Sequence, residues 1–119
     1  MFALPPQARV YLASQPVDMR AGHNGLFAII QKWGLDPFGG DLFAFIGKRG
    51  DRAKVLVWHR GGFVLLYKRL EKGRFRIPPC APGARTASLD ATELTMLLDG
   101  IDVTHVKRPA LWEPPRRTA

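Results

Sequence analysis

The sequence predicts a single α+β domain, in which an antiparallel β-meander of four to five strands packs against two α-helices and carries a basic β-hairpin. Three observations support this class. The chain has 119 residues, a length typical of one domain. Several strand-like runs follow one another with gaps too short for parallel crossovers. Two further segments have the i, i+3, i+4 spacing of apolar residues that indicates amphipathic helices.

The first third of the chain predicts one strand and one helix. β-Branched and aromatic residues at 9–14 indicate a short strand. Asp18 is a suitable N-cap for a helix that runs to Trp33, and Gly34 is a suitable stop. The apolar stripe of this helix consists of Leu26, Ile29, Ile30 and Trp33. The helix therefore has one face to bury against a sheet.

The middle of the chain predicts consecutive strands. Runs rich in aliphatic and aromatic residues occupy positions 42–47, 53–60 and 63–70. The residues between them, "KRGDR" and "GG", are typical of turns. A fourth run, "RFRI", covers positions 74–77. Because the gaps between these runs are so short, we expect antiparallel pairing between neighbours.

We expect a basic β-hairpin where the chain turns at Gly73. Either a type I turn with Gly73 in the left-handed conformation, or a two-residue turn that ends at Gly73, fits the sequence. In both registers Arg74 and Arg76 share one face, roughly 6.8 Å apart along the strand. The base beside them is Lys68 in the first register and Arg69 in the second. Either arrangement forms a stripe of positive charge suited to successive backbone phosphates.

The last third predicts a linker and a second helix. Residues 78–86 are rich in Pro and Gly, which indicates a linker. A helix is predicted over residues 90–100, and Asp90 and Glu93 have the spacing of a capping box. The apolar stripe of this helix consists of Leu94, Leu97, Leu98 and Ile101. The helix therefore also has a face to bury, most simply against the sheet.

These elements predict one folded unit and one tail. We expect residues 1–107 to form a single α+β domain whose basic sheet region covers residues 42–77. Residues 108–119 are rich in Pro and Arg, and we expect them to form a flexible tail.

The charge of the chain is concentrated in one segment. The sequence has 18 Lys and Arg against 10 Asp and Glu, a net charge of +8. Residues 47–76 contain ten of these bases and only two acids, so the whole surplus lies there. Such asymmetry favours an anionic partner, above all nucleic acid, although solvated strand and turn charges are the alternative. The predicted nucleic-acid-binding residues are Lys48, Arg49, Arg52, Lys54, Arg60, Lys68, Arg69, Lys72, Arg74 and Arg76.

The sequence offers little for catalysis. Its single cysteine excludes an internal disulfide, and neither CxxC nor HxxxH metal spacings nor a phosphate-binding GKS/T loop occurs. We therefore expect no catalytic residues, no metal, no cofactor and no small-molecule substrate. A cluster of Asp41, Asp99 and Asp102 is the one alternative that would suit a metal-dependent nuclease. Neither a membrane span nor a signal peptide is evident, which favours a cytoplasmic protein.

Five blocks of the chain carry a family resemblance. They are "PVDMRAGHNGL" at 16–26, "DPFGGDLFAF" at 36–45, "GDRAKVLVW" at 50–58, "GGFVLLYKRLEKGRFRIP" at 61–78 and "LTMLLDGID" at 94–102. Their order and spacing resemble the TnpB accessory protein, also called Orf2-like, of insertion-sequence-66 transposons. The chain departs from the family pattern at His59, where aspartate is common, and at Ile77, where tryptophan is common.

The resemblance implies a part in DNA transposition beside a larger transposase that holds the acidic catalytic residues. It implies no catalytic residues in this chain. Together with the charge, it predicts a non-catalytic accessory protein that binds DNA, such as transposon ends, through the basic hairpin. Two alternatives remain open. One is an adaptor that docks on the transposase without contacting DNA, and the other is the metal-dependent nuclease.

Overall fold

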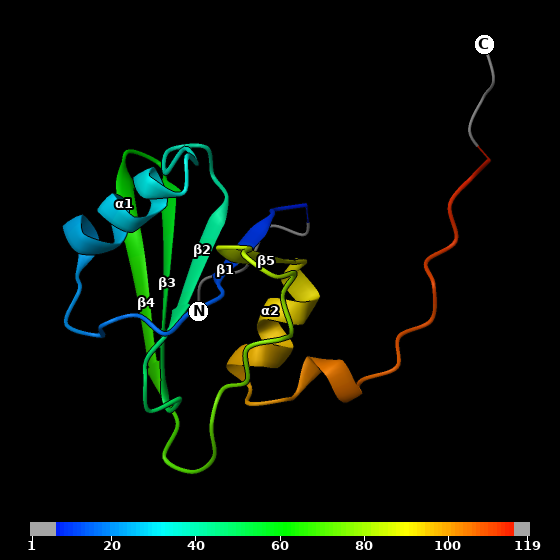
Figure 1. The fold of residues 1–119 in the computed structure, drawn as a ribbon. Helices are drawn as coiled ribbons and strands as arrows, with labels where there is room; N and C mark the ends of the chain where they lie inside the picture. Colours follow the sequence, from blue (N-terminus) through cyan, green and yellow to red (C-terminus); the bar gives the residue numbers. More distant parts are fainter. Residues whose placement is uncertain (1–6, 116–119) are drawn as a thin grey trace.

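A five-stranded mixed sheet forms the centre of the protein. The structure is a computed structural model, and it describes residues 7–115. The strands lie in the order β4–β3–β2–β1–β5 (Figure 1). Their bounds are β1 Val10–Ala13, β2 Leu42–Ile46, β3 Arg52–His59, β4 Gly62–Arg69 and β5 Thr86–Leu89. The helices are α1 His23–Lys32, α2 Ala91–Leu98 and the short 3-10 helix η1 Val103–His105. The predicted α+β class is confirmed.

The sheet is an antiparallel meander only in part. Strands β2, β3 and β4 pair antiparallel in sequence order, as predicted. Strand β1, in contrast, pairs parallel with β2 and antiparallel with β5. A parallel neighbour is possible here because residues 14–41, which include α1, give the chain enough length to cross over. The prediction of a pure meander is therefore wrong at β1, where the gap to the next strand is long.

Two apolar clusters pack on the two faces of the sheet. Alternate residues of β2 belong to different clusters, with Ala44 in one and Phe43 and Phe45 in the other. Helix α2 contributes Leu94 and Leu97 to the first cluster, and α1 contributes to the second. All five residues of β2 are buried, which explains why this strand is a continuous apolar run rather than an alternating one.

Helix α1 begins later than the sequence predicts. It starts at His23 after Gly22, whereas the predicted N-cap Asp18 lies in the preceding loop. The Asp18 carboxylate instead accepts hydrogen bonds from the backbone N–H and the guanidinium of Arg20, at 2.9 and 2.7 Å. These bonds lower the pKa of Asp18 to about 2. The predicted stop is correct, because the helix ends before Gly34, which has a positive φ of 76°.

Helix α2 has the predicted capping box. The backbone N–H of Glu93 donates to Asp90 Oδ1 at 2.8 Å, and that of Asp90 donates to Glu93 Oε1 at 3.1 Å. Its buried stripe is shorter than predicted, because Ile101 is 42% exposed. Strand β5, at the end of the predicted linker 78–86 and just before this helix, was not predicted. It is four residues long and has no strong strand signal in the sequence.

The prediction of a basic β-hairpin around Gly73 is wrong. Residues 74–77 form no strand, although Gly73 has the expected positive φ of 83°. Phe75 nevertheless points into the core and is 4% exposed, and Leu70 and Ile77 pack against the same cluster. The apolar residues therefore hold this segment without strand pairing.

After η1 the described chain runs away from the domain (Figure 1). None of the described helices has the length and apolar character needed to cross a membrane.

Candidate nucleic-acid interface

Eight of the ten predicted bases gather at one end of the sheet. This basic end comprises Lys48, Arg49, Arg52, Lys68, Arg69, Lys72, Arg74 and Arg76. They come from the turn between β2 and β3, the adjoining ends of β3 and β4, and the loop that follows β4. Residues far apart in sequence thus share one surface because the antiparallel register brings the turn and the loop together.

Backbone hydrogen bonds attach the loop after β4 to the turn before β3. The N–H of Leu70 donates to the carbonyl of Asp51, and that of Phe75 donates to the carbonyl of Gly50, both at 2.7 Å. Gly50 has a φ of 77°, and a Cβ at this position would lie 3.4 Å from the Arg74 side chain. The loop therefore folds closely over the turn. Arg74 and Arg76 lie on either side of the buried Phe75, and both are exposed.

Two arginines face each other across the sheet at this end. Arg52 on β3 is the register partner of Arg69 on β4, and like charges in such a pair repel. Neighbouring groups reduce the repulsion: Arg52 Nη1 donates to Tyr67 Oη at 3.2 Å, and Arg69 forms an ion pair with Glu71 at 2.8 Å. Arg69 is exposed, whereas Arg52 is half-buried and its Nε is a buried donor with no partner among the described residues.

Acidic residues that follow α2 reduce the positive charge of the basic end. Asp99 lies 3.8 Å from the ammonium of Lys68. The pKa of Asp102 is lowered, mainly by a hydrogen bond from Thr104, and the charge of Arg76 contributes to this shift. With Asp51 and Glu71, four acids accompany the eight bases. The local surplus of eight bases over four acids is +4, half of the +8 of residues 47–76, because two bases of that segment lie elsewhere and Asp99 and Asp102 add two acids that are remote in sequence.

Six bases of the basic end remain without an ion pair to any residue between positions 7 and 115. They are Lys48, Arg49, Arg52, Lys72, Arg74 and Arg76. All except Arg52 are exposed. Unpaired bases on one surface repel each other, so an anionic ligand that contacts several of them relieves this repulsion.

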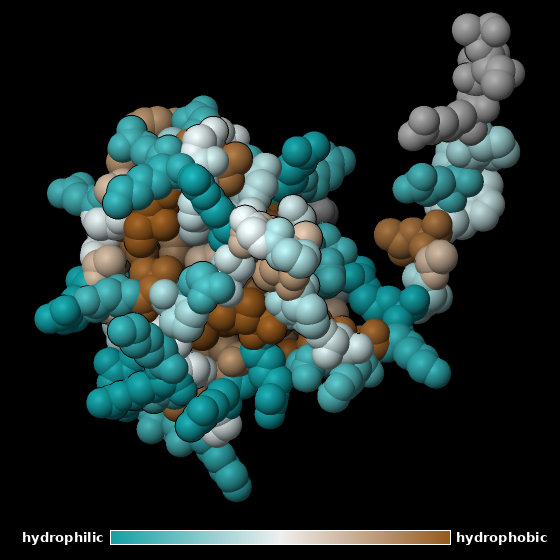
Figure 2. Space-filling view, in the orientation of Figure 1, coloured by the Kyte–Doolittle hydropathy of each residue, from teal (hydrophilic) through white to brown (hydrophobic). Residues whose placement is uncertain are grey.

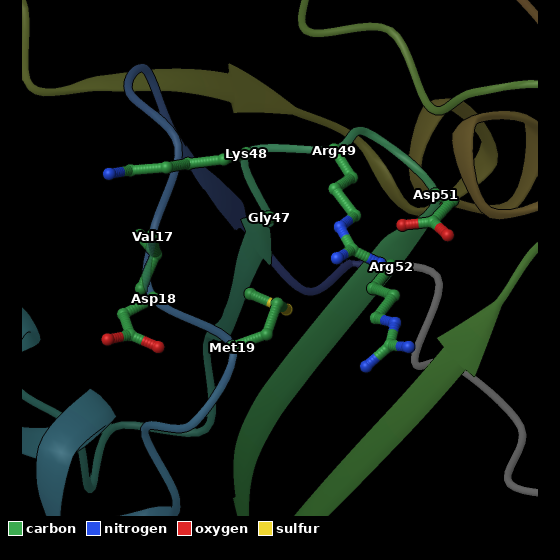
Figure 3. Close-up of a pocket in the computed structure, with 8 residues that line it drawn as sticks. All are labelled: Val17, Asp18, Met19, Gly47, Lys48, Arg49, Asp51 and Arg52. Carbon is green, nitrogen blue, oxygen red and sulfur yellow. The ribbon is translucent and has the colours of Figure 1, made fainter.

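A shallow pocket of about 430 Å³ lies beside the β2–β3 turn. Its lining combines the turn with the loop before α1, which contributes Val17, Asp18 and Met19 (Figure 3). Lys48 and Arg49 extend from the turn in different directions in this view. Charged groups thus surround the opening, and Val17 and Met19 form its apolar part.

Lys54 must be removed from the predicted set of DNA-binding residues. Its side chain is buried, at 6% exposure, and its ammonium donates to the carbonyls of Met19 and Ala21 at 2.7 and 2.8 Å. The ammonium also lies 4.8 Å from the centre of the Tyr67 ring. Lys54 therefore ties the loop before α1 to β3. The sequence pattern missed this role because the carbonyl acceptors are more than thirty residues away.

Arg60 lies at the opposite end of the β3–β4 hairpin. His59 and Gly62 are register partners, so Arg60 and Gly61 form the two-residue turn. Eight strand residues, or roughly 26 Å at 3.3 Å per residue, separate this turn from the basic end. Four aromatic rings pack near it, those of Phe27, Phe38, Trp58 and Phe63. Arg60 is therefore not part of the basic end.

The acidic cluster considered for a nuclease does not form in the described chain. Asp41 precedes β2, at the end of that strand away from the basic end, whereas Asp99 and Asp102 follow α2. Between positions 7 and 115, no group of three or more His, Cys, Asp or Glu side chains is arranged to hold a metal ion.

Comparison with known proteins identifies one family. The family model described as "IS66 Orf2 like protein", TnpB_IS66, matches residues 8–108. Uncharacterized protein y4jC of Sinorhizobium fredii is 41% identical over 109 residues, which cover 91% of this chain and 92% of the relative. Uncharacterized protein y4hO of the same organism is 37% identical over 110 residues, which cover 91% of each chain. No solved structure gives a significant match.

Proposed function

The chain belongs to the IS66 Orf2-like family, and we propose that it is a non-catalytic accessory protein of DNA transposition that binds DNA through its basic end. Family membership links the protein to transposition by IS66 elements. The observation that supports DNA as the ligand is the group of six bases without ion pairs at the basic end. Assistance to a separate transposase is the second part of the proposal.

The geometry favours contacts with phosphates over contacts with base edges. The exposed bases of the basic end lie on a turn, a strand end and a loop, and among residues 7–115 none of them lies on a helix that could enter a major groove. Lys and Arg that contact phosphates neutralise charge and release condensed counterions. Such contacts position a protein on DNA without reading its sequence. We therefore expect the basic end to bind different sequences with similar affinity, and a partner transposase to supply the choice of site.

Fluorescence anisotropy with duplex DNA tests this proposal. The variant Arg74→Gln/Arg76→Gln removes two exposed charges from the basic end. If each contacts one phosphate, the slope of log affinity against log salt should become shallower by about 1.8. Affinity should fall equally for a transposon-end duplex and an unrelated duplex. The matched control is Arg60→Gln, which removes a base from the opposite end of the same hairpin and should leave the slope unchanged.

Two results would contradict DNA binding at the basic end. One is a double variant that binds with the same slope as the parent protein. The other is an equal loss of affinity in Arg60→Gln, because that would indicate a response to net charge rather than to a located surface. Circular dichroism should show that all three proteins are folded, since exposed charges contribute little to stability.

A docking role on the transposase is the second candidate. It is favoured by the four acids among the bases, which give this end the mixed charge that is common at protein interfaces. A pull-down with purified transposase, with and without nuclease treatment, distinguishes the two. Binding that survives nuclease treatment and disappears in Arg74→Gln/Arg76→Gln, with no affinity of the parent for DNA alone, would select the adaptor.

A further inference from the structure

The outer edge of β4 is open in the described part of the chain. β4 is the first strand of the sheet, and among residues 7–115 it pairs only with β3. It has eight residues, the same length as β3. Natural sheets protect long edges with charges, prolines or bulges. Here Lys68 and Arg69 protect only the last part, and residues 62–66 are uncharged and half-buried. This edge is a template for a further strand.

The register of the hairpin fixes which backbone groups of β4 are available. His59 and Gly62 flank the two-residue turn, and such a pair exchanges both of its hydrogen bonds. Every second residue from Gly62 onward therefore bonds to β3. The residues between them direct their N–H and C=O groups away from the sheet, and these residues are Phe63, Leu65 and Tyr67. No backbone hydrogen bond links these three to any described element outside the sheet.

We propose that β4 pairs antiparallel with β4 of a second copy of the chain, so that two five-stranded sheets become one continuous sheet in a two-fold dimer. The register that uses all three outward-facing residues places Leu65 on the two-fold axis. Phe63 then lies opposite the partner's Tyr67, and Leu65 lies opposite the partner's Leu65. A symmetric pair of this kind closes and leaves no further open copy of the same edge.

The side chains of β4 are complementary to themselves in this register. Both faces of the new pairing are apolar: Phe63 meets the partner's Tyr67 on the α1 face, and Val64 meets the partner's Leu66 on the α2 face. Tyr67 is 51% exposed in the single chain, so the pairing with the partner's Phe63 would bury part of its ring.

The charges of the strand are also accommodated. Lys68 and Arg69 lie opposite the partner's Gly62 and the partner's Gly61, which bring neither charge nor side chain. No like charges therefore face each other directly across the new pairing. These matches favour a second copy over an unrelated strand as the occupant of the edge.

The dimer would keep its two basic ends apart. Pairing about Leu65 places the two copies of Arg69 eight residues apart along the joined strands, or roughly 26 Å. The two-fold axis runs through the sheet from face to face, so both basic ends lie toward opposite ends of the same assembly. A nucleic acid that contacts both would need to extend along the direction of the joined strands.

Cysteine cross-linking tests the register directly. In a Cys80→Ser background, Leu65→Cys places two thiols across the two-fold axis with Cα atoms about 5.5 Å apart, within the range for a disulfide. Val64→Cys is the matched control, because its two copies are displaced along the strands and fall outside that range. Mild oxidation should link Leu65→Cys at least about fivefold more than Val64→Cys. Equal linking of both variants, or of neither, would overturn the proposed pairing.

Sedimentation of the unmodified protein provides a test that does not depend on any variant. The mass at micromolar concentration should be twice the 13.3 kDa of one chain. Hydrogen exchange at the amides of Phe63, Leu65 and Tyr67 should slow as the protein concentration rises, because dimer formation places these groups in hydrogen bonds. A monomer at all concentrations would refute a second copy as the occupant. Neither measurement contains DNA, so the dimer and the proposed function fail separately.

Discussion

The two ends of the β3–β4 hairpin belong to the same pair of strands but differ in what holds them. At the far end, the Arg60–Gly61 turn lies beside four packed aromatic rings, with Trp58 and Phe63 at 5.1 Å between ring centroids. At the basic end, a loop is attached to the β2–β3 turn by two backbone hydrogen bonds, and its bases point outward. The far end is thus held by aromatic packing, whereas the basic end is held by backbone hydrogen bonds together with the buried side chain of Phe75. The second arrangement leaves charged side chains available to bind a ligand.

Hydrophilic and apolar residues are interspersed on the face of the molecule that Figure 2 shows. Hydrophilic side chains project from several parts of the domain, and apolar residues form patches between them. Exposed charges contribute little to folding, whereas packed aromatic rings contribute through buried area and ring contacts. We therefore expect substitutions at the aromatic end to reduce stability and substitutions at the basic end to reduce binding.

Trp58→Ala should have the largest effect on stability. The indole contacts Phe38 and Phe63, with ring centroids 5.1 Å away in each case. Loss of these contacts should reduce the free energy of unfolding by roughly 3 kcal/mol, at the lower end of the range for aromatic truncation because Trp58 is only half-buried. Urea titration followed by circular dichroism measures this change.

The matched control for Trp58→Ala is Arg74→Gln at the basic end. Its free energy of unfolding should differ from that of the parent by less than about 0.5 kcal/mol. An equal loss of stability in the two variants would show that the basic end also supports the fold, and the division between the two ends would then be wrong.

The elements of the fold could be predicted where local chemistry determines them. The capping box at Asp90 and Glu93 and the helix stop at Gly34 depend on neighbouring residues, and both are present. The position of β1 between β2 and β5 depends on pairing across long separations, for which a single sequence gives no signal. Helix α1 begins later than the sequence predicts, because the Asp18 carboxylate accepts hydrogen bonds from Arg20, two residues further along the chain, instead of capping the helix.

The candidate site could be predicted in composition but not in arrangement. The concentration of bases in residues 47–76 predicts the basic end, and eight of the ten predicted nucleic-acid-binding residues lie there. The sequence could not show that Lys54 points inward, because its acceptors are carbonyls of a distant loop. Nor could it show that Asp99 neutralises Lys68, because that contact depends on where α2 ends. Both differences arise from tertiary contacts.

Lys54→Met should have a moderate effect on stability and none on DNA affinity. The substitution keeps an unbranched apolar side chain but leaves the carbonyls of Met19 and Ala21 without their donor. A buried acceptor without its partner costs about 1 to 3 kcal/mol. Thermal unfolding and fluorescence anisotropy measure the two quantities on the same protein.

The surface control for Lys54→Met is Lys72→Met, which removes an equal charge from the basic end. It should weaken DNA binding and leave stability nearly unchanged. If Lys54→Met weakens DNA binding while the protein stays folded, then Lys54 reaches the ligand and our assignment of its role is wrong.

The smallest effect concerns the turn at the aromatic end, and it should be stabilising. Arg60 has a φ of 43°, and the following Gly61 has a φ of 85°, so both residues of the turn have the positive φ of a type I′ turn. A residue with a Cβ is strained in this region, and asparagine tolerates it better than arginine does. Arg60→Asn should therefore raise the free energy of unfolding by about 0.5 to 1 kcal/mol. Arg60→Gln removes the same charge without this conformational preference, so the difference between the two variants in urea titration isolates the backbone contribution. Equal stability of Arg60→Asn and Arg60→Gln would show that the turn does not strain residue 60.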